Sequence, residues 1–331
     1  MTERYRAGGL TRVAVLDDYH HRAHGYADWA SLGPQVEVVF FHDPIGQDAL
    51  AGALADFDVV VLMRERTPLR KPVLQSLPRL RLVVTTGMRN ASVDVGYLSE
   101  RGVIVSGTDG SGRRPGPGVP STAEVAWALV LAVCKRVTAE DRAIRDGRWQ
   151  VGMPVTLAGA TLGLAGLGTL GAAMVGPARA FGMEIVAWSQ NLTLDRADAV
   201  GVRMVSKDEL LSESDVLSVH LVLSERTTGL FQAADLARMK RTAVLVNTSR
   251  GPIVDERALI DALRSRTIAG AGLDVYDTEP LPPGHELTTL DNVVLLPHLG
   301  YVSEPGFRHM YGQVVADIAA FLLGAPIRVL G

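Results

Sequence analysis

The residues Thr161-Leu-Gly-Leu-Ala-Gly166-Leu-Gly168-Thr-Leu-Gly171 are the most informative part of this chain about its fold. This stretch begins as an apolar strand, continues through glycines spaced G-x-G-x-x-G, and opens a helix-compatible run from Ala172 to Phe181. In this setting Gly166 permits a tight turn, Gly168 lets the backbone approach a pyrophosphate, and Gly171 lets the helix pack on the strand. The spacing alone is weak evidence in a chain with 34 glycines. Because it joins a strand to a helix here, it predicts a dinucleotide-binding turn.

The N-terminus of the helix that follows the glycines is the second part of this predicted cofactor site. Backbone N–H groups at a helix N-terminus point outward and carry a partial positive charge, which suits a phosphate. Thr169 and Leu170 lie between Gly168 and Gly171, just before this helix, and we expect them to contact the cofactor as well. The alternative is a simple strand-to-helix turn that uses glycine only for its backbone freedom.

The residues that would read the cofactor's ribose follow the next predicted strand, Glu184 to Trp188. An acid is usual about 20 residues after the glycines, but this strand is followed by Ser189, Gln190 and Asn191. These neutral side chains can hydrogen-bond either a 2′-hydroxyl or a 2′-phosphate, and Arg196 is the nearest cation. The sequence therefore predicts NAD or NADP as cofactor and does not choose between them.

Two series of apolar, strand-like runs alternate with helix-compatible stretches. The first series is Val13–Leu16, Val36–Phe41, Val59–Met63, Leu82–Thr85 and Val103–Ser106. The second is Thr161–Leu164, Glu184–Trp188, Val216–Leu221, Ala243–Asn247, Gly272–Val275 and Val293–Leu296. Continuous apolar strands alternating with helices are typical of buried parallel sheets. We expect an α/β protein with two doubly wound, open parallel-sheet domains, a Rossmann cofactor domain and a flavodoxin-like substrate domain.

A glycine- and proline-rich stretch, Gly110 to Pro120, separates the two series because it can sustain neither helix nor strand. One long helical pattern then runs from Ser121 to about Arg145, and a final one from Glu304 to Leu323. The predicted domains are a substrate domain at residues 1–115 and 304–331 and a cofactor domain at residues 116–303.

Three motifs stand at the ends of predicted strands in the second series: Asn247-Thr-Ser-Arg250-Gly251, Asp274-Val-Tyr-Asp-Thr-Glu279-Pro280 and Pro297-His298-Leu-Gly300. Doubly wound folds bind their ligands at the carboxyl ends of parallel strands. Reducing a 2-keto acid needs a cation for the substrate's carboxylate and polarised carbonyl, which Arg250 can supply. It also needs a proton donor. His298 can be that donor, with Glu279 orienting its ring and favouring the imidazolium.

Each of these residues also has a purely structural interpretation. Arg250 could pair with Asp255. Glu279 could cap a turn before Pro280, and His298 could be a hydrogen-bonded interior histidine. Their joint occurrence behind a dinucleotide turn favours catalysis.

The glycine turn and these motifs resemble the D-isomer-specific 2-hydroxyacid dehydrogenases, a family that includes phosphoglycerate dehydrogenases and glyoxylate/hydroxypyruvate reductases. The resemblance runs through most of the chain and is strongest from Ser121 to Gly300. It implies that Arg250, Glu279 and His298 form the catalytic triad of an NAD(P)-dependent oxidoreductase acting on a small 2-keto or D-2-hydroxy acid. It also implies the two-domain plan and a homodimer built on the cofactor domains.

The same resemblance implies further contacts. Asp274 would reach the nicotinamide carboxamide, and Thr248 and His298 would also lie at the cofactor. The backbone near Gly87 and Met88 would hold the substrate carboxylate.

Arg64 follows a predicted strand of the first series and is a weaker candidate for contact with the substrate. A solvated charge cluster with Glu65 and Arg66 is the alternative.

Some positions depart from the family pattern. Val125 follows Glu124 where the family often has histidine, and Val222 stands where it often has proline. Formate dehydrogenases of the family pair their histidine with glutamine, so Glu279 argues against formate as the substrate.

Composition limits the partners. The chain has 36 acidic and 33 basic residues and a net charge of −3, which gives no basic surface for nucleic acid or an anionic membrane. Its longest apolar run is far shorter than the roughly 20 residues that cross a bilayer. The charged N-terminal stretch lacks the apolar core of a signal peptide. We therefore expect a cytoplasmic protein whose partner is a small molecule.

The only cysteine, Cys134, lies in an apolar run and is expected to be a buried structural thiol. The histidines show no metal-ligand spacing with cysteine or paired carboxylates, so we expect no metal.

An NAD(H)-gated binding protein is the competing interpretation. The resemblance also covers dimeric transcriptional corepressors, which keep the same three residues on the same fold, and fold does not fix function. Turnover of a 2-keto acid would discriminate between the two.

Overall fold

The computed structural model describes residues 10–109 and 120–331. The chain divides into two compact units, Met1–Pro115 together with Val302–Gly331, and Gly116–Tyr301. Both are α/β units built on parallel sheets, so the predicted fold class is confirmed. Apart from Pro120, the predicted glycine- and proline-rich break lies outside the described residues.

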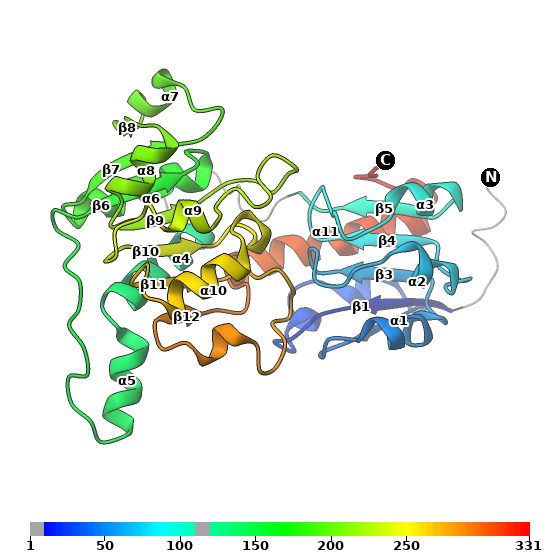
Figure 1. Ribbon diagram of the computed structural model, residues 1–331. Helices are drawn as coiled ribbons and strands as arrows, with labels where there is room; N and C mark the ends of the chain where they lie inside the picture. Colours follow the sequence, from blue (N-terminus) through cyan, green and yellow to red (C-terminus); the bar gives the residue numbers. More distant parts are fainter. Residues whose placement is uncertain (1–9, 110–119) are drawn as a thin grey trace. The chain divides into compact units, whose positions relative to one another are not determined.

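The first unit contains a parallel sheet, drawn in blue to cyan in Figure 1. Its strands are β1 (Thr11–Val15), β2 (Val36–Phe40), β3 (Val59–Leu62), β4 (Leu82–Thr85) and β5 (Ile104–Gly107). Its helices are α1 (Gln47–Leu54), α2 (Lys71–Gln75), α3 (Val95–Glu100) and α11 (Glu304–Leu322), with the short 3-10 helices η1 (Ala23–Gly25) and η2 (Trp29–Leu32). Within the described residues the strand order is β2-β1-β3-β4-β5. This is the flavodoxin-type order, in which the winding reverses between β1 and β3.

Helices bury the sheet of the first unit, which explains why its strands read as continuous apolar runs. Every residue of β3 and β4 is buried. One core cluster joins the strands to these helices. It contains Leu50 of α1, Leu74 of α2 and Leu98 of α3. α11 packs against β4 and β5, and burying apolar side chains in this way is the main stabilising contribution to such a layer.

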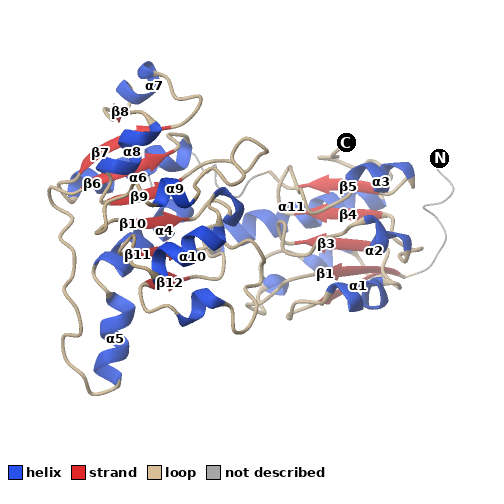
Figure 2. Cartoon of the chain, in the orientation of Figure 1, coloured by secondary structure: helices blue, strands red, loops and turns tan. Residues whose placement is uncertain are grey.

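The second unit contains a larger parallel sheet, and Figure 2 separates its strands from the helices around them. Its strands are β6 (Thr161–Ala165), β7 (Glu184–Trp188), β8 (Arg203–Met204), β9 (Val216–Val219), β10 (Val244–Asn247), β11 (Gly270–Leu273) and β12 (Val293–Leu295). Its helices are α4 (Ser121–Cys134), α5 (Val137–Arg145), α6 (Thr169–Ala180), α7 (Leu194–Asp198), α8 (Lys207–Glu213), α9 (Ala233–Leu236) and α10 (Glu256–Arg264), with η3 (Gly251–Ile253) and η4 (Glu286–Thr289). Among the described residues the order is β12-β11-β10-β9-β6-β7-β8. The winding reverses between β6 and β9, as in Rossmann folds.

Two apolar clusters lie against this sheet. One joins the strands to α8, α9 and α10, and the other joins them to α4, α6 and α7. Cys134 belongs to the second cluster and is buried, and burial raises the pKa of its thiol to about 11. The expectation of a buried thiol is therefore confirmed.

The structure corrects the predicted helix from Ser121 to Arg145, which is two helices. Arg136 adopts a left-handed conformation, φ 56°, between α4 and α5. Its guanidinium lies against Gly152, where a Cβ would come within 2.1 Å of the Arg136 Nε atom. The apolar pattern of the sequence encodes neither the left-handed conformation nor this contact.

Two smaller predictions are also corrected. α6 begins at Thr169, so Gly171 lies inside the helix rather than before it. The sequence does not predict strand β8. Its two residues, Arg203 and Met204, are both exposed, so they form no apolar run. In the described part of the chain, no helix is long and apolar enough to cross a membrane.

Candidate active site

The glycine turn after β6 can be built only with glycine at two positions. Gly166 has φ 104°, and a Cβ there would lie 2.4 Å from the carbonyl oxygen of His220. A Cβ on Gly171 would lie 2.1 Å from the carbonyl oxygen of Gly166. Both contacts are with backbone, which cannot move aside cheaply. The turn is therefore closely packed between β6, β9 and α6.

Gly168 is different, because nothing lies within 4 Å of its Cβ position. It is the N-cap of α6 and offers no side chain to the N–H groups of Thr169, Leu170 and the rest of the first turn. An open, uncapped helix N-terminus fits the pyrophosphate of a dinucleotide. The predicted cofactor turn therefore has the shape that its cofactor requires.

The end of β7 lies beside this turn. The N–H of Gly166 donates to the carbonyl oxygen of Trp188 at 2.8 Å. Gln190 and Asn191 are exposed just beyond, and Ser189 is half-buried. The predicted ribose-reading segment is thus adjacent to the predicted phosphate site.

His298 and Glu279 are in direct contact. Nδ1 of His298 lies 2.6 Å from Oε2 of Glu279, and both side chains are partly buried. The other carboxylate oxygen accepts the backbone N–H of Tyr276 at 3.0 Å. Both oxygens of the Glu279 carboxylate therefore have a partner. Because Nδ1 of His298 faces Glu279, Nε2 is the ring nitrogen that can face a substrate.

The loop that presents His298 is held by Asp274, which follows β11. Its two oxygens accept the backbone N–H groups of Leu299 at 2.6 Å and Gly300 at 2.8 Å. Burial raises the pKa of Asp274, an effect that these two N–H groups oppose. The hydroxyl of Thr122, at the start of α4, donates to the carbonyl oxygen of Gly300 at 2.8 Å.

Arg250 follows β10, and backbone and side-chain bonds fix its loop. Asn247 donates from Nδ2 to the carbonyl oxygen of Arg250 at 2.9 Å, and Arg250 donates from Nη1 to that of Ser249 at 2.7 Å. Asp255, the alternative partner suggested by the sequence, accepts the N–H of Ala258 as the N-cap of α10. The Arg250 loop is therefore an ordered part of the strand-end edge.

The Arg250 and Glu279 loops touch at Gly251. A Cβ there would lie 2.1 Å from the carbonyl carbon of Tyr276 and 2.6 Å from the nitrogen of Asp277. Glycine is needed for this approach. It brings the loops after β10 and β11 together, and the contact between Glu279 and His298 adds the loop after β12.

Thr248 lies in the same strand-end region. Its hydroxyl oxygen is buried and has no hydrogen-bond partner among the described residues. A bound molecule that supplies a polar atom here would satisfy that oxygen, which fits the predicted cofactor contact.

The predicted substrate residues Arg64, Gly87 and Met88 lie together in the first unit. Arg64 follows β3, and its N–H donates to the hydroxyl of Thr86 at 2.8 Å. A Cβ on Gly87 would lie 3.0 Å from Nη1 of Arg64. Met88 is exposed next to them. The structure thus gathers these three at the carboxyl ends of β3 and β4.

Sequence reasoning missed several residues that support the site. These residues hold the loops of the site through tertiary contacts that no local sequence pattern encodes. They are Thr122, Tyr276, Leu299 and Gly300. Tyr301 was also missed, although it stands only three residues after His298; its ring meets the imidazole edge-on, with centroids 5.4 Å apart.

His220 closes β9 beside the glycine turn. Its Nε2 lies 2.9 Å from the hydroxyl of Ser218, and its buried Nδ1 has no hydrogen-bond partner among the described residues. Burial lowers the pKa of His220 to about 4. The ring is therefore neutral at physiological pH.

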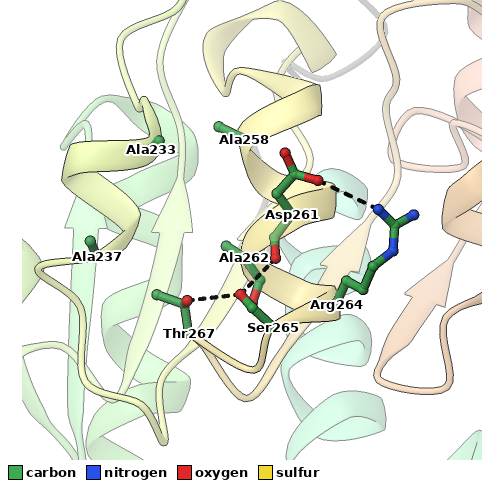
Figure 3. Close-up of a pocket in the computed structure, with 8 residues that line it drawn as sticks. All are labelled: Ala233, Ala237, Ala258, Asp261, Ala262, Arg264, Ser265 and Thr267. Carbon is green, nitrogen blue, oxygen red and sulfur yellow. Dashed lines mark hydrogen bonds and ion pairs between the residues drawn. The ribbon is translucent and has the colours of Figure 1, made fainter.

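Other features of the described residues carry less chemistry. They contain no group of three or more His, Cys, Asp or Glu side chains able to hold a metal. A shallow pocket between α9 and α10 is shown in Figure 3. Alanines make up half of its lining, and Ser265 bonds with Thr267 and the Asp261 carbonyl rather than facing a ligand.

Comparison with known proteins places this site in a family. Residues 127–300 match the family described as D-isomer specific 2-hydroxyacid dehydrogenase, NAD binding domain. A glyoxylate reductase from Korarchaeum cryptofilum is 36% identical, covering 89% of this chain and 86% of that protein. A hydroxypyruvate reductase from Blautia hydrogenotrophica is 29% identical, covering 96% of this chain and 99% of that protein. The solved structure of a phosphoglycerate oxidoreductase from Vibrio cholerae O395 is 32% identical with a TM-score of 0.88, covering 96% of this chain and 100% of that one.

The chain therefore belongs to the D-isomer-specific 2-hydroxyacid dehydrogenase family. This confirms the predicted family and the predicted class of activity, an oxidoreductase that transfers hydride between a nicotinamide dinucleotide and a 2-hydroxy or 2-keto acid. The same comparison confirms that the cofactor is a nicotinamide dinucleotide, NAD or NADP.

Proposed function

We propose that Arg250, Glu279 and His298 carry out this hydride-transfer reaction, and that the substrate is a small 2-keto acid such as glyoxylate or hydroxypyruvate. The observation that carries the residue assignment is the 2.6 Å contact between His298 and Glu279 at the strand-end edge that also holds the glycine turn. The names of the reductases similar to this chain support the choice of substrate.

The residues that would hold the dinucleotide follow β6, β7, β10, β11 and β12 at that edge. Gly166, Gly168, Thr169 and Leu170 would hold the pyrophosphate, and residues 189–191 the ribose. Thr248, Asp274 and His298 would lie toward the nicotinamide. The bound nicotinamide would supply the hydride in reduction or accept it in oxidation.

The protein's own contribution is charge and a proton. Arg250 would bind the substrate carboxylate and polarise the carbonyl with its planar, permanently charged guanidinium. His298 would hold a proton on Nε2, since Nδ1 faces Glu279, and would donate it to the carbonyl oxygen as negative charge develops there. The Glu279 carboxylate would favour the imidazolium and fix the orientation of the ring.

For the substrate carboxylate, Gly87 and Met88 of the first unit are proposed as a backbone site with Arg64 beside it. The 3.0 Å approach of the Arg64 guanidinium to the Cβ position of Gly87 supports this. A glycine there leaves room that any side chain would fill.

Steady-state turnover tests the proposal. The purified chain should oxidise NADH or NADPH with glyoxylate, hydroxypyruvate or another member of a 2-keto acid panel, and the His298→Ala variant should not. A folded protein that binds the dinucleotide tightly but turns over none of the panel would favour the cofactor-gated binding protein instead.

We also propose that the chain is a homodimer built on its cofactor unit. Figure 1 shows α5 and the loop after it extending away from the sheet of that unit. This arm carries exposed apolar side chains, among them Trp149 at 77% and Met153 at 88% exposure. Exposed apolar surface of this kind commonly marks an interface between copies.

We also propose a cytoplasmic location, because the nicotinamide dinucleotide that this family uses is an intracellular cofactor. Fractionation of cells that express the chain tests it.

A further inference from the structure

The loop that carries Glu279 is long and largely exposed, yet it must hold one carboxylate in place. It runs from Tyr276 to the start of η4 at Glu286. Asp277, Thr278 and Pro280 are exposed, as are three residues near its far end. Exposed loops of this kind are the mobile parts of most proteins. Some contact outside the loop has to restrain it.

Glu256 contacts both ends of this loop. It is the first residue of α10, and its Oε2 accepts the backbone N–H of Asp277 at 3.2 Å. Its Oε1 lies 3.3 Å from Nε2 of His285, eight residues further along. Both side chains are about one-fifth exposed. A single carboxylate therefore spans the segment in which Glu279 lies.

The bonding of His285 shows why this contact is specific. The backbone N–H of Leu287 donates to Nδ1 of His285 at 3.3 Å, which makes His285 the N-cap of η4. Since Nδ1 accepts, the neutral ring carries its proton on Nε2, the atom that faces Glu256. A proton thus points at the carboxylate even when the ring is uncharged.

Glu256 also links this loop to that of Arg250. It lies six residues after Arg250, and between them Gly251 touches the Tyr276–Asp277 peptide. Asp255 next to it caps α10 and is directed to Ala258. The charges nearby are Asp255, Asp277, Arg257 and Glu286, and Arg257 pairs with Asp261 and Glu286 rather than with Glu256.

We propose that Glu256, together with His285, is a positioning residue that holds the Glu279 loop against the Arg250 loop. It touches neither substrate nor cofactor. It acts by keeping Glu279 in contact with His298, so that the imidazolium needed for keto-acid reduction persists at higher pH. This inference rests on the proposed roles of Glu279 and His298.

The test compares Glu256→Ala with a matched control, Glu286→Ala. Glu286 is a carboxylate on η4 that pairs with Arg257 and Arg264 of α10. Its loss also weakens the attachment of η4 to α10 but leaves the Asp277 N–H bonded. Glu256→Ala should lower kcat for keto-acid reduction about 5- to 30-fold and move the alkaline limb of the pH–rate profile to lower pH by about half a unit or more. Glu286→Ala should leave that limb in place.

Glu256→Gln is the second variant, in case the alanine variant folds poorly. The Asp277 N–H and the His285 Nε2 lie against different oxygens of Glu256, so a carboxamide can present its oxygen to one of them and must present its NH2 group to the other. We expect a kcat and a pH limb between those of the native protein and of Glu256→Ala. A profile in which the carboxamide is as damaging to kcat as alanine, with no shift of the limb in either variant, would overturn the proposal.

Hydrogen exchange gives a readout that does not depend on turnover. In Glu256→Ala the amide of Asp277 should exchange at least about tenfold faster, while in Glu286→Ala it should not change. Unchanged exchange in Glu256→Ala would contradict the clamp itself. If the native chain turns over no 2-keto acid but exchange behaves as expected, the clamp stands and the proposed function fails.

Discussion

At the scale of single residues, the proposed acid–base chemistry depends on the contact between two atoms, Nδ1 of His298 and Oε2 of Glu279, which lie 2.6 Å apart. His298→Ala removes the proposed proton donor and should lower kcat by on the order of 100-fold or more. Glu279→Gln keeps the shape but loses the charge that favours the imidazolium, so the pH optimum for keto-acid reduction should move downward. Pre-steady-state and steady-state rates between pH 5 and pH 9 provide the measurement. A pH profile that Glu279→Gln leaves unchanged would falsify the pairing.

In the proposed cofactor site, the ribose would contact another small set of residues, Ser189, Gln190 and Asn191. None is acidic, so nothing in this segment repels a 2′-phosphate, and we expect less than about a 1000-fold preference for NADH over NADPH. Ser189→Asp adds the missing charge and should shift kcat/KM toward NADH by at least about tenfold. If the ratio of kcat/KM values stays the same, the ribose is read elsewhere. Asp195→Asn, on an exposed part of α7, is the control.

At the scale of elements, the end of β9 links pH to stability. His220 is neutral in the folded state, with its pKa lowered to about 4 from an ordinary value of 6.5. Between these two values the unfolded chain binds a proton that the folded chain does not, so stability falls as pH drops from about 6.5 toward about 4. The contribution lost from pH 7 to pH 5 is about 2 kcal/mol.

Denaturant unfolding at the two pH values measures this loss, and His220→Asn should show less of it even if it is less stable at pH 7. The same decline in both proteins would assign the pH dependence to other groups. Bound dinucleotide should raise the stability at both pH values and leave the decline between them in place.

The sequence predicts a helix or strand well where the burial of that element leaves its own pattern in consecutive residues. Strands such as β3, β4, β9 and β10 are buried on both faces, so a continuous apolar run is their direct signature. β8 has no such signature, since its two residues are exposed at the sheet edge. At the break between α4 and α5, the Arg136 side chain packs against Gly152, sixteen residues away. Sequence pattern cannot report a contact of that range.

The same division holds for the site. Arg250, Glu279 and His298 could be proposed together because parallel strands bring their carboxyl ends to one edge, so a residue's place after a strand predicts its neighbours. What fixes those residues was not found. Thr122 and Glu256 belong to helices, and only the folded packing brings them to the loops that they hold.

At the scale of the whole molecule, the two units have different sheet orders, and each reverses its winding at one point. In each unit the predicted ligand residues lie at strand ends beside that point: Arg64 after β3, and the glycine turn after β6. The proposed dinucleotide site and Arg250 thus belong to one unit, and the proposed backbone contacts to the substrate carboxylate, at Gly87 and Met88, belong to the other. A chain divided in this way can change either specificity by altering a few loops.

The arm formed by α5 and residues 146–156 gives the prediction at this scale. An arm with Trp149 and Met153 in water has an unfavourable apolar exposure that a second copy would remove. We expect light scattering and sedimentation equilibrium to give the mass of two chains at micromolar concentration. Trp149→Asp combined with Met153→Asp should raise the dimer dissociation constant at least about 100-fold, because two charges would have to be buried. Leu323→Asp, at an equally exposed apolar position of α11's end, should leave the dimer intact. A native chain that sediments as a monomer, or a double variant that still dimerises, would show that the arm serves another purpose.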